Sequence, residues 1–494
     1  MTATRSETPE VLGHLDRRVP TSFYWSLTLL ATVGGFLFGY DTANIGSVLK
    51  FLPYELTPLV EGYLVAGASI GAAVGALAAG RLSDRFGRKS LLIIDAAIYA
   101  VGALLSAFAW DLSVLLIART LIGLAIGADS AIATAYIAEY APKARRGALA
   151  MLQQWMITVG ILVSYLVALA VLLPLPDSTK TLDWRLILGI GAIPALIAVV
   201  LRARMPESPR WLMRQGRFDD TRDALSKLGI NVTSEQVERS AQVVDEQERA
   251  ARKSPTKWSR GVRRALVIVC VFFVFQQITG INMPFYYGPK LLAPYLQSGS
   301  DEVAAAIAAV AVTAVLSTIN VIATYVAFKF IDRIGRRKLA IGGYAGMAAA
   351  MLIGAAGVAL TGGLTRVVFI MIGLSLFITA FAIGVGGTGW LIQGEYFPTA
   401  VRGRAAAFGA SVDWLANFAL ILLVPTMLTG LGLGWVMVLF AALSVLAILF
   451  VVAFLPETKE LSVEEITEIF ERQATGGSGS HPEDRLIPVG AGRT

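Results

Sequence analysis

Charged residues, cysteine and histidine are all scarce in this chain of 494 residues. Only 16% of the residues are charged, against about a quarter in soluble globular proteins, which leaves too little polar surface for a water-soluble fold. The single cysteine, Cys270, excludes an intramolecular disulfide. The two histidines, His14 and His481, lie in the polar termini, so any proton path through the apolar part must use carboxylates.

The motifs of enzymes and of ATP-driven pumps are also missing. The sequence has no nucleophile–histidine pair, no metal-ligand cluster and no phosphate-binding loop with its lysine. We therefore expect neither enzymatic activity nor a metal or other cofactor.

Hydrophobic residues supply 55% of the chain and gather in long runs. The runs near 25–48, 90–110, 185–201, 340–361 and 432–455 each reach or approach the ~20 residues that cross a bilayer as a helix. The first run follows about twenty mostly polar residues and lacks a small-residue cleavage site, which argues against a signal peptide. About twelve such helices can be placed, so the sequence predicts an all-α membrane protein surrounded by the lipid bilayer.

Positive charges lie in every second loop. Lys and Arg gather at 81–89, 143–146, 202–264, 329–338 and 402–404, whereas the alternate loops near 50–58, 109–112, 295–302 and 429–434 are almost free of them. This pattern follows the positive-inside rule and places both termini in the cytoplasm. It also accounts for the net charge of +7 without a nucleic-acid partner. With no cysteine pair, short outer loops and compact termini, the chain looks bacterial, and we expect a monomer in the cytoplasmic (inner) membrane.

Three acidic motifs recur roughly half a chain length apart. The pairs are Asp84 with Asp332, each in an Asp-Arg-x-Gly-Arg motif, Glu139 with Glu395, each in Glu-Tyr-x-Pro, and Glu207 with Glu457, each preceded by proline. Two parallel halves of this kind are related by a pseudo-two-fold axis along the membrane normal, with the substrate site between them near the midplane.

One long polar interruption divides the spans into six and six. It contains helix-like stretches at 218–228 and 234–252. Near the C-terminus, Ser462 and Glu465 form a capping box for a short amphipathic helix ending at Arg472, and the tail from 476 has a disordered composition. The predicted domains are a cytoplasmic N-terminal tail at 1–21, six-helix bundles at 22–204 and 263–456, an intracellular helical linker at 205–262, and a cytoplasmic C-terminal helix and tail at 457–494.

These motifs resemble the sugar porter family of the major facilitator superfamily. The most specific are Pro206-Glu-Ser-Pro-Arg-Trp-Leu212 with its partner Pro456-Glu-Thr-Lys459, and Gln276-Gln-Ile-Thr-Gly-Ile-Asn282 followed by Phe285-Tyr-Tyr287. The match runs from about residue 25 to 472. The resemblance implies twelve transmembrane helices in two six-helix pseudo-symmetric bundles with a cytoplasmic helical linker, and transport of a small-molecule sugar or polyol by alternating access.

Asp41 lies inside the first apolar run, where an ionisable side chain is costly and needs a partner. The best-placed partner is Arg119 in the outer part of the fourth span. The pair acts either as a static bridge between two helices or as a switch, in which Asp41 is ionised beside the arginine and protonated when the pair opens. Proton-coupled family members resemble this chain here and uniporters have a neutral residue, so the resemblance favours a proton as the coupling ion.

A sugar site needs neutral hydrogen-bonding groups and flat apolar faces. Side chains of these kinds match the sugar-contacting positions of the family at Gln154, Gln276, Gln277, Asn282, Asn320 and Trp390. To the expected site we add three residues of the eleventh span, Asp413, Trp414 and Asn417. Because amides within a membrane also join helices to one another, a purely structural role is the alternative for each of them.

Acids and arginines lie at the cytoplasmic ends of the spans. The resemblance assigns them to a charge network that locks the outward-facing state, formed by Asp84, Arg88, Glu139, Arg146, Asp332, Arg336, Glu395 and Arg402. It assigns Glu207 and Arg210 to a latch in the helical linker. Positive-inside topology alone would explain the arginines but not the paired acids.

Two departures concern the expected sugar site. Glycines flank Trp390 where sugar porters usually have prolines, which predicts a softer bend of the tenth span. Asp413 stands where an amide is usual, so it could accept a sugar hydroxyl, attract a cationic group or bind a proton. The structural alternative is a hydrogen bond from Asn417, one turn further along.

A third departure is Asp129 in the fourth span, where small residues are expected. It lies about 15 Å deeper toward the cytoplasm than Arg119, so it either relays a proton inward from Asp41 or pairs with an arginine at the cytoplasmic end. We expect Asp95, which lies close to the basic loop ending at Lys89, to be structural.

The favoured function is secondary active import of a sugar or polyol by proton symport through alternating access. The alternatives are an uncoupled sugar facilitator with a structural Asp41, and a proton-coupled transporter of a cationic or other small polar metabolite that uses Asp129 and Asp413. A membrane sensor that binds sugar without moving it is disfavoured, because such proteins usually carry a long cytoplasmic signalling tail.

Overall fold

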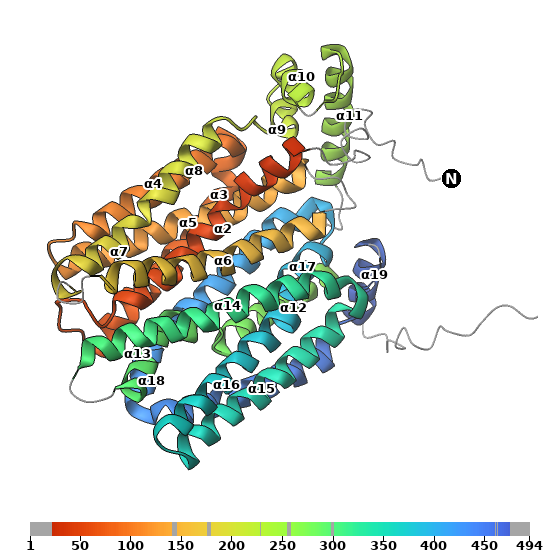
Figure 1. The fold of residues 1–494 in the computed structure, drawn as a ribbon. Coiled ribbons are helices and arrows are strands. Elements are labelled where there is room, and N and C mark those ends of the chain that lie inside the picture. The colour runs from red at the N-terminus through yellow and green to blue at the C-terminus, as the bar shows by residue number, and fades with distance from the viewer. Residues whose placement is uncertain are drawn as a thin grey trace, which may run out of the picture.

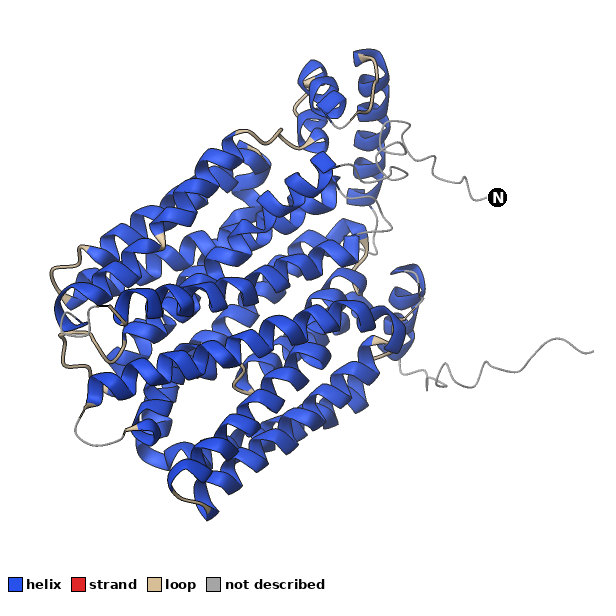
Figure 2. Cartoon of the chain, in the orientation of Figure 1, coloured by secondary structure: helices blue, strands red, loops and turns tan. Residues whose placement is uncertain are grey.

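The computed structural model describes residues 22–140, 146–174, 179–227, 229–253, 258–297, 301–459, 461 and 463–474. Every regular element in these ranges is a helix, and the ranges contain no strand (Figure 2). The predicted N-terminal tail and the predicted disordered C-terminal tail lie outside the described residues.

The first half of the chain forms the helices of six spans. Long apolar runs become helices because backbone polar groups in hydrocarbon must pair within their own segment. The sixth span is interrupted, since a π-helical turn and a helix of seven residues precede its last helix. The elements are α2 (Ser22–Val48), α3 (Pro58–Phe86), α4 (Arg88–Ala107), α5 (Leu112–Tyr140), α6 (Arg146–Leu172), η3 (Thr179–Asp183), α7 (Trp184–Ile190) and α8 (Ala192–Ala203).

The linker folds as three short helices, α9 (Pro209–Arg214), α10 (Phe218–Lys227) and α11 (Ser234–Lys253). The two stretches predicted to be helical are confirmed as α10 and α11. Ser208 caps α9, because its hydroxyl accepts a hydrogen bond from the backbone N–H of Trp211 at 3.3 Å, and Pro209 supplies the fixed φ of the first turn.

Two spans of the second half, the seventh and the tenth, are broken in the middle. The seventh consists of α12 (Arg260–Ile278) and α13 (Met283–Leu296), separated by a turn in which Gly280 has a φ of 94°. The tenth consists of α16 (Gly363–Phe381), the π-helical turn η5 (Ala382–Gly386) and α17 (Gly387–Glu395). The eleventh and twelfth form one element, α18 (Thr399–Phe454), which is kinked at Gly432. The remaining helices are α14 (Glu302–Ile334), α15 (Arg336–Leu360) and α19 (Val463–Ala474).

Twelve spans follow from these helices. Ten continuous stretches of the described chain are long and apolar enough to cross a bilayer. One of them, Val401–Phe454, holds two spans on either side of its kink, and α2 with its 27 residues supplies the first span. The predicted fold class is therefore confirmed, and the amphipathic helix predicted near the C-terminus is confirmed as α19.

The spans form two bundles, α2–α8 in red to yellow and α12–α18 in green to blue (Figure 1). We call the end of the molecule that carries α9–α11 and α19 the linker end, and the end formed by residues 49–57, 108–111 and 361–362 the far end. The halves meet where α3 packs on α18, α6 on α14 and α2 on α13. Small residues bring helix backbones together within a half, since a Cβ on Gly123 of α5 would overlap the backbone of Ala68 in α3.

Glycine is required at the turn between the second and third spans and at its counterpart between the eighth and ninth. Gly87 has a φ of 92° and Gly335 a φ of 100°, a region that side chains with a Cβ rarely enter. Space gives a second reason, because a Cβ on Gly87 would overlap the carboxylate of Glu207 and one on Gly335 that of Glu457. The recurring Gly-Arg of the two halves thus marks the same turn built twice.

We expect Gly87→Ala to lower the melting temperature of the purified protein, because the backbone strain alone costs about 1–3 kcal/mol. Gly80→Ala is the matched control, since Gly80 lies in helix α3 with nothing near its missing Cβ, and alanine favours a helix by about 0.5–1 kcal/mol. Equal melting temperatures for the two variants would contradict the requirement for glycine at the turn.

Candidate functional site

Asp41 of α2 and Arg119 of α5 form a bidentate ion pair inside the N-terminal half. Nη1 and Nη2 of Arg119 donate to the two carboxylate oxygens of Asp41, the second at 2.9 Å, and Nε donates to the backbone oxygen of Leu64 at 3.2 Å. Asp41 is 1% exposed and Arg119 0% exposed. A charge removed from water this completely needs its partner, and these are the two residues that the sequence predicted to pair.

A hydrogen-bonded cluster, buried except at the half-buried Asn282, joins the break in the seventh span to the eleventh span. Nε2 of Gln277 donates to Oδ1 of Asp413 at 2.8 Å. Nδ2 of Asn282 donates to Oε1 of Gln277 at 2.9 Å and to Oδ1 of Asn417 at 3.0 Å. Four of the predicted binding residues are therefore brought together, and we call them the amide cluster.

The amide cluster also reaches the other half of the molecule. Nδ2 of Asn417 donates to the hydroxyl of Ser69 in α3 at 2.8 Å. Nearby, the indole of Trp414 packs edge-on against the ring of Phe38 in α2, with ring centroids 4.8 Å apart. Sequence reasoning missed Ser69, because one hydroxyl among the small residues of a span carries no signal of its own.

The expectation that Asn417 bonds Asp413 is wrong. The two side chains are one helical turn apart, but both ends of the Asn417 amide are occupied by Asn282 and Ser69. The donor to Asp413 is Gln277 instead. No ion pair or further hydrogen bond to Asp413 is found among the described residues.

The other predicted binding residues lie outside the amide cluster. Gln276 supports the tenth span, because its Nε2 donates to the backbone oxygens of Val385 at 3.2 Å and Gly386 at 3.0 Å in η5. Trp390 packs on the ring of Phe273, with centroids 5.2 Å apart. The remaining two are Asn320 of α14, which accepts a hydrogen bond from Thr324, and Gln154, which is half-buried on α6.

A π-helical turn occupies the place where the tenth span was predicted to bend softly. A π-helical turn leaves backbone carbonyls without their usual partners, and the Gln276 amide takes up two of them. Gly389 keeps this contact close, since a Cβ there would press on Phe273 and on the Gln276 oxygen. The glycines that flank Trp390 therefore allow the tenth span to pack closely against α12.

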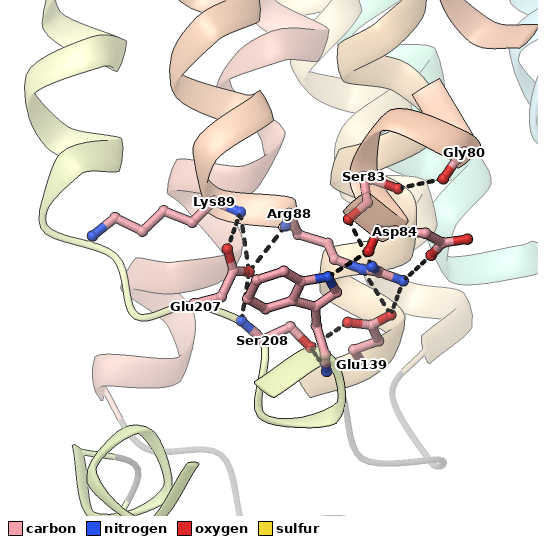
Figure 3. A network of polar contacts seen from close by, with 9 residues as sticks. Gly80, Ser83, Asp84, Arg88, Lys89, Glu139, Glu207 and Ser208 are labelled. Atoms are coloured by element: carbon pink, nitrogen blue, oxygen red, sulfur yellow. Dashed lines mark hydrogen bonds and ion pairs between the residues drawn. The ribbon is translucent and has the colours of Figure 1, made fainter. Parts of the chain in front are cut away.

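At the linker end, Glu207 caps the N-terminus of α4 (Figure 3). Its carboxylate accepts hydrogen bonds from the backbone N–H groups of Arg88 at 3.0 Å and Lys89 at 3.1 Å. Arg88 then reaches Glu139 with Nε at 3.2 Å and Asp84 with Nη2 at 3.0 Å. An anion at the positive end of a helix is stabilised by several oriented N–H groups at once.

The C-terminal half repeats this arrangement. Glu457 accepts hydrogen bonds from the backbone N–H groups of Arg336 at 2.9 Å and Arg337 at 3.1 Å, at the start of α15. Nη2 of Arg336 is 2.8 Å from Glu395, whose other oxygen accepts from the hydroxyl of Thr458 at 2.7 Å. The predicted internal repeat thus extends to individual hydrogen bonds.

Each of these networks lies within its own half. The ion pairs of Arg88 with Asp84 and Glu139, and of Arg336 with Glu395, each lie within one half, so these pairs do not hold the halves together at the linker end. Arg402 donates from Nε to the backbone oxygen of Phe397 at 3.0 Å, and Arg210 is half-buried on α9. The side chains of Arg146 and Asp332 lie outside the described residues.

Two tyrosines next to the networks remain neutral hydrogen-bond donors. Burial, reinforced by the nearby carboxylates of Glu395 and Glu457, raises the pKa of Tyr396 well above its usual value. Burial likewise raises the pKa of Tyr140, whose hydroxyl donates to the backbone oxygen of Glu207 at 3.0 Å. The hydroxyl of Tyr396 donates to the backbone oxygen of Pro456 at 3.3 Å, so each tyrosine bonds the end of a span to the Pro-Glu motif of its own half.

At the far end, by contrast, the two halves are bonded together. Lys290 of α13 forms an ion pair with Glu61 of α3, whose side chain is only 8% exposed. The hydroxyl of Tyr165 in α6 donates to the backbone oxygen of Phe285 at 2.5 Å. Gly46 of α2 packs so closely on the backbone of Tyr286 that a Cβ would not fit. The far end is therefore closed between the halves.

Two like bundles of six spans, with a polar cluster between them and a closed far end, define a membrane transporter of the major facilitator type. A family model described as "Sugar (and other) transporter" matches residues 27–470. The chain therefore belongs to this family of sugar porters, as its motifs predicted.

Individual relatives match nearly the whole chain. It is 35% identical to the arabinose-proton symporter of Bacillus subtilis, over 90% of this chain and 94% of that protein. It is 36% identical to the glucose transporter GlcP of Staphylococcus epidermidis, over 91% of this chain and 97% of the relative. The structure is similar to the partially occluded inward open conformation of the xylose transporter XylE from E. coli, with a TM-score of 0.76, 29% identity, and coverage of 90% and 100% of the two chains.

We expect Glu61→Gln to favour opening at the far end. Because the ion pair with Lys290 is partly exposed, its loss lowers the free-energy difference that favours the closed far end by about 0.5–1 kcal/mol. The population that is open at the far end should then be roughly two- to five-fold larger. The measurement is the rate at which an impermeant thiol reagent labels Asn44→Cys on the far side, in a Cys270→Ser background.

Two further variants make this test specific. Glu55→Gln, in the exposed loop between α2 and α3, is the matched control and should leave the labelling rate unchanged. Exchanging the charges in the double variant Glu61→Lys, Lys290→Glu should restore slow labelling. Equal rates for Glu61→Gln and Glu55→Gln would contradict a role for the ion pair in closure.

Proposed function

We propose that this protein imports a neutral sugar or polyol by proton symport through alternating access. The observation that carries the proposal is the buried Asp41–Arg119 pair close to the amide cluster between the halves. Tyr286 of α13 connects the two places, because its fully buried side chain interacts with Asp41 and Arg119 and also with Asn417. Relatives named for arabinose–proton symport and for glucose transport support the proposal.

The amide cluster has the chemistry that a polyhydroxylated substrate requires. The side chains of Gln277, Asn282 and Asn417 each offer both a donor and an acceptor, so they can bond hydroxyl groups in either sense. Trp390 and Trp414 supply flat apolar faces for the C–H patches of a sugar ring. Gln154, Gln276 and Asn320 belong to the proposed site as supporting residues on the neighbouring spans.

The ion pair is the proposed coupling element. With Asp41 ionised, Arg119 is fully paired and α2 is held against α5. Protonation of Asp41 removes one of two buried charges, and breaking a buried pair costs about 3–5 kcal/mol unless the remaining charge is compensated. Proton binding can therefore change which arrangement of the two halves has the lowest free energy.

The expected topology completes the proposal. The linker end faces the cytoplasm, both termini lie there, and the protein resides in a bacterial inner membrane, because the positive charges gather at this end. The bundles at 22–204 and 263–456 then move relative to each other as units. In this proposal the linker at 205–262 acts as a latch, and its residues Glu207 and Arg210 attach it to the N-terminal bundle.

A cationic metabolite is the second candidate substrate, and Asp413 is the observation that favours it. This carboxylate is 4% exposed and is bonded by a neutral amide rather than by a basic group of the described chain. A buried carboxylate in this situation is stabilised either by a proton or by a positive charge on the substrate.

Proteoliposome uptake of labelled hexoses, pentoses, polyols and organic amines decides between the two substrate classes. We expect a neutral sugar or polyol to accumulate only when a proton gradient is directed inward. Accumulation of an amine alone would overturn the neutral substrate and leave proton coupling intact. Uptake of sugar that ignores the gradient would overturn the coupling and leave the substrate class intact.

We expect Asp41→Asn to abolish accumulation against a gradient while it spares counterflow exchange, because asparagine keeps the shape but cannot exchange a proton. Asp111→Asn is the matched control, since this exposed acid caps α5 at the far end through the backbone N–H of Val114. It should keep uphill uptake. Intact uphill uptake by Asp41→Asn would remove this residue from the coupling step.

A further inference from the structure

A second set of buried charges lies in the N-terminal half, nearer the linker end. Arg202 of α8 donates from Nη1 to Oδ1 of Asp95 in α4 at 2.8 Å, and its Nη2 is 2.6 Å from Oδ1 of Asp129 in α5. The exposed fractions are 4% for each aspartate and 1% for the arginine. Of the alternatives predicted for Asp129, pairing with an arginine is thus present, and Asp95 shares the same partner.

The charges of this cluster do not balance when both aspartates are ionised. One guanidinium faces two carboxylates, which leaves a surplus negative charge at a buried site. Oδ2 of Asp95 and both oxygens of Asp129 lack a well-oriented hydrogen-bond donor. Two carboxylates this close cannot both ionise cheaply, and they relieve the surplus by sharing one proton.

No other described titratable group compensates the surplus. The electrostatic partners of Asp95 are Asp129 and Arg202, and those of Asp129 are Arg202 and Asp95. From α2, the contacts come from Gly34 and from the backbone oxygen of Leu30, to which Nε of Arg202 donates at 3.4 Å. The neighbouring residues of α5, Ala125 and Ile126, are apolar.

A small cavity lies beside the cluster. Its walls include Asp95, Asp129, Gly34, Leu37 and Tyr99. The hydroxyl of Tyr99 donates to the backbone oxygen of Leu37 at 3.1 Å, and the same side chain interacts with Asp41 and Arg119. Gly34 leaves room for the Asp129 carboxylate, because a Cβ there would occupy the position of that carboxylate.

The cluster lies closer to the linker end than Asp41 does. Along α2, Gly34 is seven residues from Asp41, or about 10 Å at 1.5 Å per residue, in the direction of the linker end. Arg202 is the last residue but one of α8, and Asp95 lies within the first two turns of α4. A proton held there therefore has only a short distance to the linker end.

We propose that Asp95, Asp129 and Arg202 form a second proton-binding site, in which the two carboxyl groups share one proton that exchanges with the linker side. Uptake of the proton converts one carboxylate to a carboxylic acid, whose O–H donates to the other carboxylate, and the site becomes neutral. Release restores the surplus charge. The site stands apart from the proposed coupling at Asp41, and either can exist without the other.

A purely structural role makes a different prediction. Arg202 also donates to the backbone oxygen of Leu92 at 2.7 Å, so it ties α2, α4 and α5 together whether or not a proton binds. An arginine that only links helices needs a single carboxylate to balance its charge. The second carboxylate is what requires a bound proton, and a spectroscopic readout of protonation separates the two roles.

Infrared difference spectroscopy of the full-length protein in lipid nanodiscs is the direct test. We expect the wild type to show the carbonyl stretch of a carboxylic acid that shifts in D₂O and disappears as the pH of the buffer is raised. Asp95→Asn and Asp129→Asn should each lower the intensity of this band by one carboxylic acid, because one remaining carboxylate balances Arg202 without a proton. Asp41→Asn should keep the band, which separates this site from the coupling pair.

Several results would overturn the proposal. One is a titrating band that keeps its full wild-type intensity in both Asp95→Asn and Asp129→Asn, since a weaker residual band can come from the buried carboxyl group of Asp413, and another is a wild-type spectrum without a titrating carboxylic acid. A band that is lost in the variants but stays constant across the pH range would show a fixed proton and would also contradict exchange. Circular dichroism and a monodisperse elution profile confirm that the variants are folded, and Asp111→Asn serves as the control for losing an exposed acid.

Discussion

The pairing of every described buried cation with a carboxylate is the constraint on which the rest of the structure depends. An unpaired charge within a membrane span is costly, whereas the apolar faces of helices gain little by meeting each other in lipid. The ion pair of Asp41 with Arg119 therefore fixes α2 against α5, and Arg202 fixes α8 against α4 and α5. These contacts join spans far apart in the sequence, and they specify the N-terminal bundle more sharply than apolar packing would.

The duplicated network at the linker end explains why motion is expected between the bundles rather than within them. Glu207 and Glu457 each bind the N-terminus of a helix in their own half. Arg88 pairs with Glu139 at the end of the fourth span, and Arg336 pairs with Glu395 at the end of the tenth. Each half is thereby tied into one body. The contacts that cross between the halves are of another kind, since they involve hydroxyls, amides and the ion pair at the far end, which can be exchanged at moderate cost.

The sequence predicted features that follow from composition or from local pattern. Twelve spans follow from the apolar runs, the two like halves from the three recurring acidic motifs, and the partner of Asp41 from the rule that a buried acid needs a cation. The contacts of Ser69 and the pair of Glu61 with Lys290 could not be predicted, because each depends on which helix faces meet. An arginine partner was one of the alternatives predicted for Asp129, but neither its identity as Arg202 nor the second acid, Asp95, could be predicted. Arg202 illustrates the difficulty. In the sequence, Arg202 is the first charged residue of a basic loop. Only the packing of α8 on α4 places it next to two acids.

The internal hydrogen bonds of the amide cluster give substrate binding a mechanical consequence. Gln277 and Asn282 are bonded to Asp413 and Asn417, so a substrate hydroxyl that binds through the same amide atoms must replace those bonds. Exchange of one hydrogen bond for another costs little, whereas a buried donor left without a partner costs about 1–3 kcal/mol. Because Asn417 also holds Ser69 of the opposite half, a substrate that captures its amide loosens a contact between the bundles. Occupancy of the site and the freedom of the halves to move are then coupled through the same side chain.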